Sequence, residues 1–153
     1  GEPIPGRIAA RYALSKSAKR RAKFDQLLAR RRAGVAIVTD RYPQIEVPGL
    51  HDGPILAGRA PNARLAAMQA EERALYAEMA AYVPTLVIRL HVDVDTVMAR
   101  KPDHDRALIT RKVETVPLLT FHGAPIVDID ATIPYDEELA LAIAAVDRAL
   151  GSD

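Results

Sequence analysis

The sequence lacks cysteine and has few aromatic residues, and both features limit what the chain can do. Without cysteine it can form no disulfide bond, thiolate metal site or cysteine nucleophile, which fits a reducing, cytoplasmic compartment. Aromatic residues make up 5% of the chain, which leaves little for stacking on single-stranded nucleic acid. No apolar run approaches the roughly 20 residues that span a bilayer, and no signal peptide opens the chain. We therefore expect no membrane partner.

The 153 residues, 49% hydrophobic and 27% charged, predict one ordinary globular domain over residues 1–153. The net charge of +1 hides an asymmetry. From Arg7 to Arg32 there are ten Lys and Arg residues and one acid, Asp25, which gives +9 there and −8 over the rest. A basic end of this kind attracts phosphate groups or nucleic acid.

Helical and strand patterns alternate along the chain. Helices are predicted at 7–33, 63–82, 106–116 and 135–150, with a short helix after Asp93 that ends near Lys101. Short apolar runs predict strands at 35–39, 85–92 and 125–130, and four prolines and three glycines predict a long loop at 40–62. This order predicts an α/β fold, a three-layer parallel sheet with helices on both faces.

Asp40 and Arg41 follow the predicted strand 35–39 directly. Ligands of parallel α/β sheets collect at the carboxyl ends of the strands, and an arginine fork matches phosphate oxygens. A neighbouring aspartate can hold the arginine or take a proton from an attacking oxygen. The alternative interpretation is an ordinary strand end with a surface ion pair, because short motifs are frequent by chance.

The segment Thr39-Asp40-Arg41-Tyr42, preceded by an arginine-rich helix, resembles the Asp-Arg-Tyr/Phe segment of thymidylate kinases and their relatives. The run from Pro84 to Asp93, then a short helix and Arg100-Lys101, is similar to their fourth strand and lid. The run from Ile126 to Ala131 resembles their fifth strand and adenine-side loop. The likeness covers nearly the whole chain from about residue 15. It implies a P-loop kinase-like fold and phosphoryl transfer from ATP, with Mg²⁺, to a small nucleotide-like acceptor.

The family's Gly-x-x-x-x-Gly-Lys-Ser/Thr loop is missing, because the chain contains no Gly-Lys pair. We therefore expect the C-terminal part of a kinase-like protein without its central P-loop strand. An empty place in the sheet leaves backbone groups unpaired and apolar surface in water. The isolated chain is accordingly predicted to be marginally stable and inactive.

The resemblance implies roles for individual residues. Arg41 matches the arginine that grips the acceptor phosphate, and Asp40 matches its acidic partner; both are predicted to be catalytic. Tyr42, Arg20 and Arg21 are substrate-binding candidates, although Tyr42 fits the core equally well and the helix arginines fit a solvated basic face. Arg100 and Arg106 are the favoured lid residues among the cations Arg100, Lys101, Arg106, Arg111 and Lys112. Ala131 and Thr132 match the loop beside adenine.

Some features depart from thymidylate kinases or stay open. The loop from Pro43 to Pro54 lacks their thymine-reading pattern, so the acceptor is not named, and Glu46, His51 and Asp52 are candidate acceptor contacts. Glu72 interrupts an apolar helix stripe and is expected at its edge. The four histidines are scattered, so no metal site is predicted. The alternatives are a basic-helix module that binds nucleic acid, which the low aromatic content disfavours, and a non-catalytic kinase-like partner subunit. A homodimer also stays open.

Overall fold

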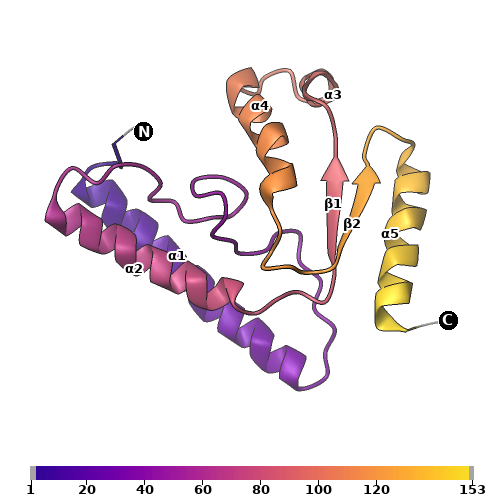
Figure 1. Ribbon diagram of the computed structural model, residues 1–153, viewed down its shortest axis with the longest axis horizontal. Coiled ribbons are helices and arrows are strands. Elements are labelled where there is room, and N and C mark those ends of the chain that lie inside the picture. Colours follow the sequence, from indigo (N-terminus) through magenta and orange to yellow (C-terminus); the bar gives the residue numbers. More distant parts are fainter. Residues whose placement is uncertain (1–2, 152–153) are drawn as a thin grey trace. The chain divides into compact units, whose positions relative to one another are not determined.

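The computed structural model describes residues 3–151, which divide into two compact units, Gly1–Tyr82 and Val83–Asp153. The first unit contains helices α1 (Arg7–Arg32) and α2 (Ala63–Ala80) (Figure 1). The second contains strands β1 (Val87–His91) and β2 (Ile126–Asp130), helices α3 (Val94–Arg100), α4 (Arg106–Thr115) and α5 (Tyr135–Leu150), and a 3₁₀ turn η1 (Val116–Leu118). The expectation of a single domain is not tested by this division and stays a prediction.

The two helices of the first unit begin where the sequence predicts and end one or two residues before the predicted ends. α1 has no internal glycine or proline, and it ends before Gly34, whose φ of 85° and N–H bond to the Arg31 carbonyl form a left-handed cap. α2 begins after Asn62, whose side chain accepts the Leu65 N–H at 3.0 Å. The predicted helices at 7–33 and 63–82 are thus confirmed.

The core of the first unit lies between α1 and α2, which run side by side (Figure 1). Two apolar clusters fill it. One joins residues of the N-terminal segment, both helices and the loop before α2: Ile4, Ala10, Ala13, Leu56 and Leu65. The other joins the C-terminal halves of the helices: Phe24, Leu28, Tyr76 and Met79. Tyr42 and Ile45 pack against the second cluster, so the start of the 40–62 loop is tied to the helix pair.

The predicted strand at 35–39 is wrong. These residues form no strand, and Val38 is 92% exposed. A strand exists only with a hydrogen-bonded neighbour, and among residues 3–151 no segment pairs with this one. Val35 and Val38 are therefore exposed, and Ile37 is only partly buried, although the pattern is that of a buried strand.

In the second unit, β1 and β2 pair in parallel, with Val87 opposite Ile126 and His91 opposite Asp130. The predicted strands at 85–92 and 125–130 are confirmed, as are the helices at 106–116 and 135–150 and the short helix that Asp93 caps. The three-layer sheet stays a prediction, because the described residues form two strands and no solved fold tests the architecture.

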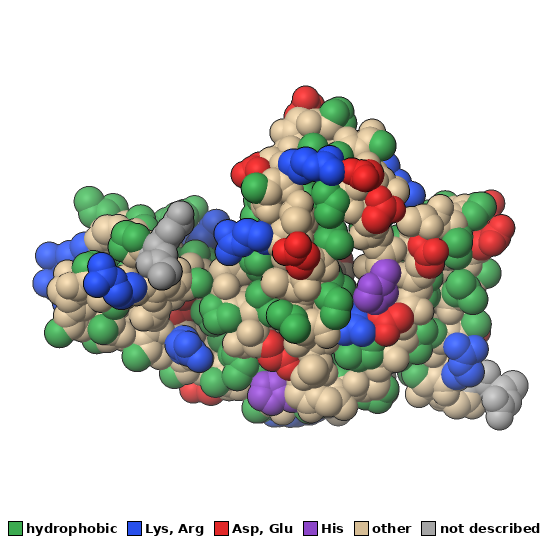
Figure 2. Space-filling model, turned by 45° about the horizontal axis from the view of Figure 1, so that its top comes forward, with side chains coloured by type: hydrophobic (Ala, Val, Ile, Leu, Met, Phe, Trp, Pro, Cys, Tyr) green, Lys and Arg blue, Asp and Glu red, His purple; other side chains and the backbone are tan. Residues whose placement is uncertain are grey.

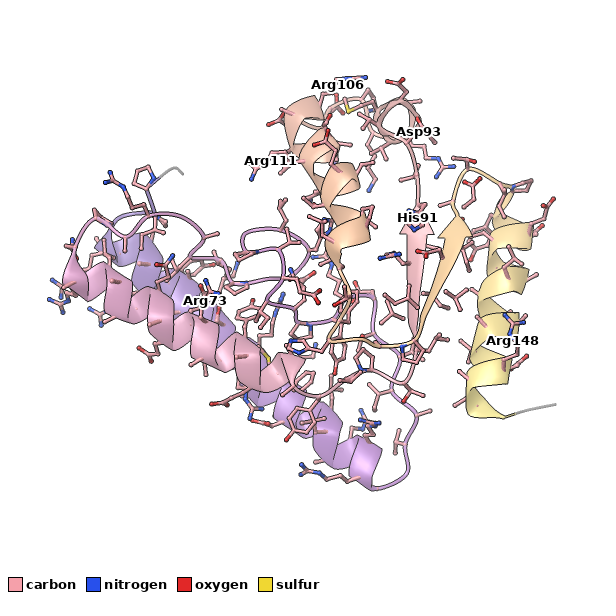
Figure 3. All side chains as sticks on the ribbon, viewed as in Figure 1. Arg73, His91, Asp93, Arg106, Arg111 and Arg148 are labelled. Atoms are coloured by element: carbon pink, nitrogen blue, oxygen red, sulfur yellow. The ribbon has the colours of Figure 1, made fainter. Side chains whose placement is uncertain are left out.

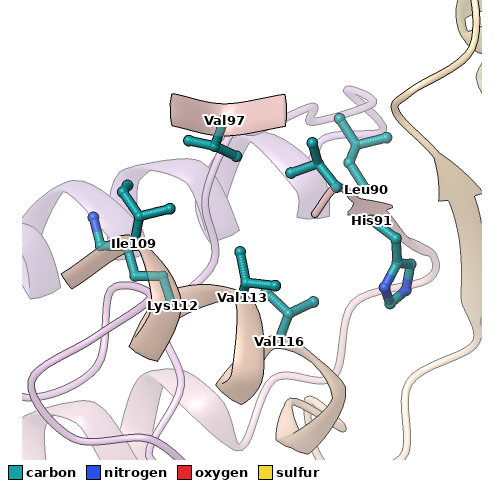
Figure 4. A pocket seen from close by; sticks show the side chains of 8 residues that line it. Leu90, His91, Val97, Ile109, Lys112, Val113 and Val116 are labelled. Carbon is teal, nitrogen blue, oxygen red and sulfur yellow. The ribbon is translucent and has the colours of Figure 1, made fainter. Parts of the chain in front are cut away.

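A cavity of about 200 Å³ opens beside β1 in the second unit. Leu90 of β1 faces Val113 and Val116 across it (Figure 4). On the face shown in Figure 2, acidic and basic side chains lie side by side over the second unit. Within residues 3–151 we find no helix with the length and apolarity that crossing a membrane requires.

Candidate functional site

Arg41 lies in the loop after α1, where two carboxylates approach its Nε atom. Asp52 Oδ2 lies 3.6 Å from Arg41 Nε, and Asp40 Oδ2 lies 3.8 Å from it. The Arg41 side chain is 70% exposed and that of Asp40 is 94% exposed. The expectation that this pair ends a buried strand is wrong, because strand 35–39 is not formed. The carboxylates that approach Arg41 come instead from the same 40–62 loop.

Asp52 links Arg41 to α1. Arg20 Nη2 donates to Asp52 Oδ1 at 2.6 Å, and Arg20 Nη1 donates to the Asp52 carbonyl at 3.3 Å. Arg20 Nη1 also donates to Tyr76 Oη of α2 at 3.3 Å. Partial burial works to lower the pKa of Arg20, but the bond to Asp52 and the neighbouring charges raise it overall, so the guanidinium stays charged. The structure thus brings together Arg20, Arg41 and Asp52, three of the residues that the sequence singles out.

Gln44 organises the loop that carries Asp52. Its side chain is fully buried, and its Nε2 donates to the carbonyls of Val47 at 3.0 Å and Leu50 at 2.8 Å. Its Oε1 accepts the Val47 N–H at 2.8 Å. A single amide therefore satisfies several backbone groups that a buried loop would otherwise leave unpaired. Sequence reasoning missed Gln44, whose only signal is a polar residue beside proline in a long loop.

The loop backbone around Asp52 is tightly constrained. His51 and Asp52 have φ values of 48° and 60°, in the left-handed region that side-chain-bearing residues rarely adopt. Gly53 follows in a crowded position, where an added Cβ would lie 2.6 Å from Gln44 Nε2 and from the Val47 carbonyl oxygen. The Asp52 carboxylate is consequently placed by the fold, and its side chain is only 13% exposed.

Tyr42 and Arg21, two other substrate-binding candidates, contact the helix pair. The Tyr42 ring meets Phe24 edge-on at 5.7 Å between centroids, and its hydroxyl donates to the Tyr82 carbonyl. Burial raises the pKa of Tyr42. The Arg21 guanidinium donates to Asp25 and, at 3.1 Å, to Glu78 of α2. These contacts favour the structural interpretation of both residues.

In the second unit, two residues predicted to bind the cofactor meet. Arg100 Nη2, at the end of α3, donates to the Ala131 carbonyl at 2.9 Å. Thr132 closes the same turn, because its Oγ1 and N–H donate to Asp130 Oδ1 at 2.7 and 2.8 Å and lower the pKa of that carboxyl. Arg106 is placed differently: its Nη2 donates to Asp95 Oδ1 at 2.5 Å, at the end of the second unit where Asp93 also lies (Figure 3).

A charged cluster on the two strands escaped the sequence analysis. Arg89 Nε and Nη2 donate to the two carboxylate oxygens of Asp128 at 2.5 and 2.9 Å, and His91 Nε2 lies within hydrogen-bonding distance of the same carboxylate. The Arg89 bonds, and then the His91 bond, lower the pKa of Asp128 to about 2. The sequence signal for this charged cluster is the two-residue spacing of Arg89 and His91, which places both side chains on one face of the strand.

The described residues contain no group of three or more His, Asp or Glu side chains that could hold a metal ion. The expectation that Glu72 lies at the edge of its helix stripe is wrong. Glu72 is fully buried, and it accepts hydrogen bonds from Ser17 Oγ at 2.6 Å and from the Leu56 N–H at 2.7 Å. Its carboxyl therefore fastens the loop to both helices in place of an apolar contact.

Comparisons with known proteins give two similar relatives in Escherichia coli K12. The chain is 42% identical over 148 residues to a protein named uncharacterized ATP-binding protein YghS. It is 37% identical over 132 residues to one named uncharacterized ATP-binding protein YghR. No family model matches the chain, and no solved structure matches it.

The chain is shorter than both relatives. The match takes up 95% of this chain but 62% of YghS, and 85% of this chain but 52% of YghR. The chain therefore spans between half and two thirds of the length of the curated relatives that it matches. A nucleotide site in those proteins can involve residues for which this chain has no counterpart.

Proposed function

We propose that this chain is the acceptor-binding and lid part of an ATP-dependent phosphotransferase, related to the thymidylate kinase group, that acts on a small phosphate-bearing acceptor such as a nucleotide. The observation that carries the proposal is the placement of Arg41. Its guanidinium is exposed, and its Nε lies 3.6 Å from a largely buried carboxylate, Asp52. An exposed arginine with a carboxylate beside it is suited to receiving phosphate oxygens.

The names of YghS and YghR support ATP as the phosphoryl donor, because both proteins are called ATP-binding and their matches cover most of this chain. In the second unit, Arg100 lies beside the Ala131–Thr132 turn that we assign to the adenine side. Arg106 begins α4, from which a lid cation would act. In this proposal Asp40 orients or deprotonates the acceptor beside Arg41.

Among residues 3–151 we identify no phosphate-binding loop and no cluster of three or more side chains that could hold a metal ion. The sequence has no Gly-Lys pair to cradle phosphates. The described residues offer no metal-binding cluster, and the Ala131 carbonyl already accepts from Arg100. We therefore propose that residues outside this chain hold the phosphates and the metal, and that the isolated chain is inactive. The same contacts are compatible with a non-catalytic partner subunit and with a homodimer.

The test is a coupled assay for ADP formation from ATP and magnesium, with nucleoside monophosphates as acceptors. It is run on the isolated chain and on the longest natural protein that carries this sequence. We expect no turnover by the chain and turnover by the longer protein. Arg41→Ala is expected to lower kcat/KM of the longer protein by roughly a hundredfold, because the positive charge that binds and orients the acceptor phosphate is lost.

Arg64→Ala is the matched control, because Arg64 is an exposed arginine at the start of α2. Its kcat/KM should stay within about twofold of the unchanged protein. Absence of turnover in both proteins, or equal losses in the two variants, would refute the proposed function. Turnover by the isolated chain that Arg41→Ala abolishes would refute the claim that the chain is inactive alone.

A second candidate function, binding of double-stranded nucleic acid, is favoured by the outer side of α1. The cations concerned are exposed and form no ion pair with another described residue: Lys16, Lys19, Lys23 and Arg30. Their spacing places them along one stripe of the helix. The measurement is DNA binding between about 50 and 200 mM salt. The second candidate requires a salt-dependent affinity that Lys19→Ala and Lys23→Ala weaken.

A further inference from the structure

We propose that Asp52 is a positioning residue for Arg41, and that Arg20 acts through Asp52 and not on the acceptor. The three side chains then form one relay from α1 to the exposed guanidinium. The proposal deepens the proposed function and rests on it for the identity of the anion that Arg41 receives. The relay itself rests on contacts within the first unit.

Asp52 is anchored from the interior side of the unit. Arg20 donates to Asp52 twice: Nη2 donates to the carboxylate at 2.6 Å, and Nη1 donates to the carbonyl at 3.3 Å. Nη1 also donates to Tyr76 Oη at 3.3 Å. The ring of Tyr76 is buried in the second apolar cluster. The chain of contacts therefore begins in the core and ends at a carboxylate with one oxygen directed toward Arg41.

The two oxygens of Asp52 serve different arginines. Oδ1 accepts from Arg20, and Oδ2 lies 3.6 Å from Arg41 Nε. The nearest approach of each carboxylate to Arg41 is at Nε. A guanidinium whose Nε faces a carboxylate can direct its Nη donors to two phosphate oxygens.

The backbone keeps Asp52 in this place. Gln44 also donates to the His51 carbonyl at 3.2 Å, next to Asp52 in the chain. The left-handed conformations of His51 and Asp52 cost energy, and they persist where the surroundings over-determine them. Arg20 and Gln44 are those surroundings. The loop therefore presents Asp52 before any ligand binds.

Charge and positioning make opposite predictions for Asp52. A carboxylate near an anion site repels the anion, so its neutralisation would tighten binding if charge alone mattered. If Asp52 orients Arg41, its neutralisation weakens binding, because the guanidinium loses its orientation. The direction of the change on neutralising Asp52 therefore distinguishes the two roles.

The first measurement is pyrophosphate binding to the full 153-residue chain by calorimetry. We expect Asp52→Asn to weaken binding about tenfold, in keeping with the loss of one charge-assisted contact. Glu71→Gln, at an exposed carboxylate of α2, is the control and is expected to leave binding unchanged within about twofold. Binding by Asp52→Asn that is unchanged or tighter would overturn the proposal.

The second measurement needs no ligand. The Arg41 Nε–H resonance is recorded by ¹⁵N NMR, and in the relay it is narrow and shifted by its carboxylate partner. Arg20→Lys keeps the charge but loses the fork, so this resonance is expected to broaden or move to its solvent-exposed position. Arg21→Lys is the matched control, because Arg21 contacts Asp25 and Glu78 instead.

The two measurements separate the relay from the proposed function. Absence of pyrophosphate binding together with an Arg41 resonance that depends on Arg20 contradicts the proposed function and supports the relay. An Arg41 resonance that is solvent-like in the unchanged chain, or unaffected by Arg20→Lys, overturns the relay. If Asp52→Asn does not fold, Arg20→Lys takes its place as the variant that tests the relay.

Discussion

The Ser17 hydroxyl of α1 donates to the Glu72 carboxyl of α2 across 2.6 Å in the interior of the first unit. The other Glu72 oxygen accepts the Leu56 N–H at 2.7 Å. Helix α1, helix α2 and the loop between them therefore meet at one buried carboxyl. This loop also carries Asp52, so the stability of the helix pair and the placement of Arg41 are connected.

Replacement of Glu72 tests this junction. Glu72→Ala removes both acceptors and leaves the Leu56 N–H buried without its partner, and the Ser17 hydroxyl loses its bond to the carboxyl, so we expect a loss of about 3 kcal/mol in the free energy of unfolding. The measurement is urea denaturation. Glu71→Ala is the control at an exposed neighbouring position, with an expected change below about 0.5 kcal/mol. Equal effects of the two substitutions would contradict the role of Glu72.

Gly53 tests the packing of the loop. The Cβ of Gly53→Ala would lie 2.6 Å from both Gln44 Nε2 and the Val47 carbonyl oxygen, so these groups must move apart and their hydrogen bond must weaken. We expect a loss of about 2 kcal/mol in the free energy of unfolding. Gly6→Ala is the control, because nothing lies within 4 Å of its added Cβ. If Gly53→Ala leaves the free energy of unfolding unchanged, the loop can adjust to the added methyl group and the expected effect of tight packing is wrong.

Local signals predicted most of the helices and strands. The absence of glycine and proline in α1, the left-handed Gly34, the Asp93 cap and the apolar runs of β1 and β2 each act over a few residues, and the structure confirms the elements that they predict. The segment 35–39 carries an equally clear strand pattern, yet it forms no strand and most of its residues are exposed. A strand needs a partner, and the described chain provides none for it.

The candidate site was predicted in part for the same reason. Arg41, Arg20 and Asp52 were each singled out from residue type and position, but their meeting at one carboxylate depends on a loop fold that Gln44 creates from within. The residue types of Gln44 and Glu72 do not predict that their side chains are buried, because polar side chains in a loop or helix are usually exposed. Contacts between residues distant in sequence decided both cases.

The low pKa of Asp128, about 2 in the folded chain, predicts a pH dependence of stability. This value lies below the usual 3.8, so the stabilisation by the Arg89 and His91 bonds is fully present above about pH 4 and is lost as the pH falls toward 2. We expect Asp128→Asn to cost about 1 kcal/mol at pH 7, because the half-exposed pair is screened by water.

The check on Asp128 is denaturation of both proteins between pH 2 and pH 7. The difference between Asp128→Asn and the unchanged chain should shrink below pH 4 and be only a small part of its pH 7 value at pH 2. Asp103→Asn, in the exposed turn before α4, is the control and should show no such trend. A difference that stays constant over this range would mean that the carboxylate form of Asp128 does not stabilise the fold.

Val38 tests whether the 35–39 segment lacks a partner that lies outside this chain. Because Val38 is 92% exposed, Val38→Lys should leave the melting temperature of the isolated chain unchanged within about 2 °C, and that temperature should lie below about 60 °C. In the longest natural protein that carries this sequence, a neighbouring strand would bury Val38, and the same substitution should lower the melting temperature by several degrees. A cooperative transition of the isolated chain well above 60 °C, or equal effects of Val38→Lys in both proteins, would contradict the expectation that the 35–39 segment lacks a partner strand in the isolated chain.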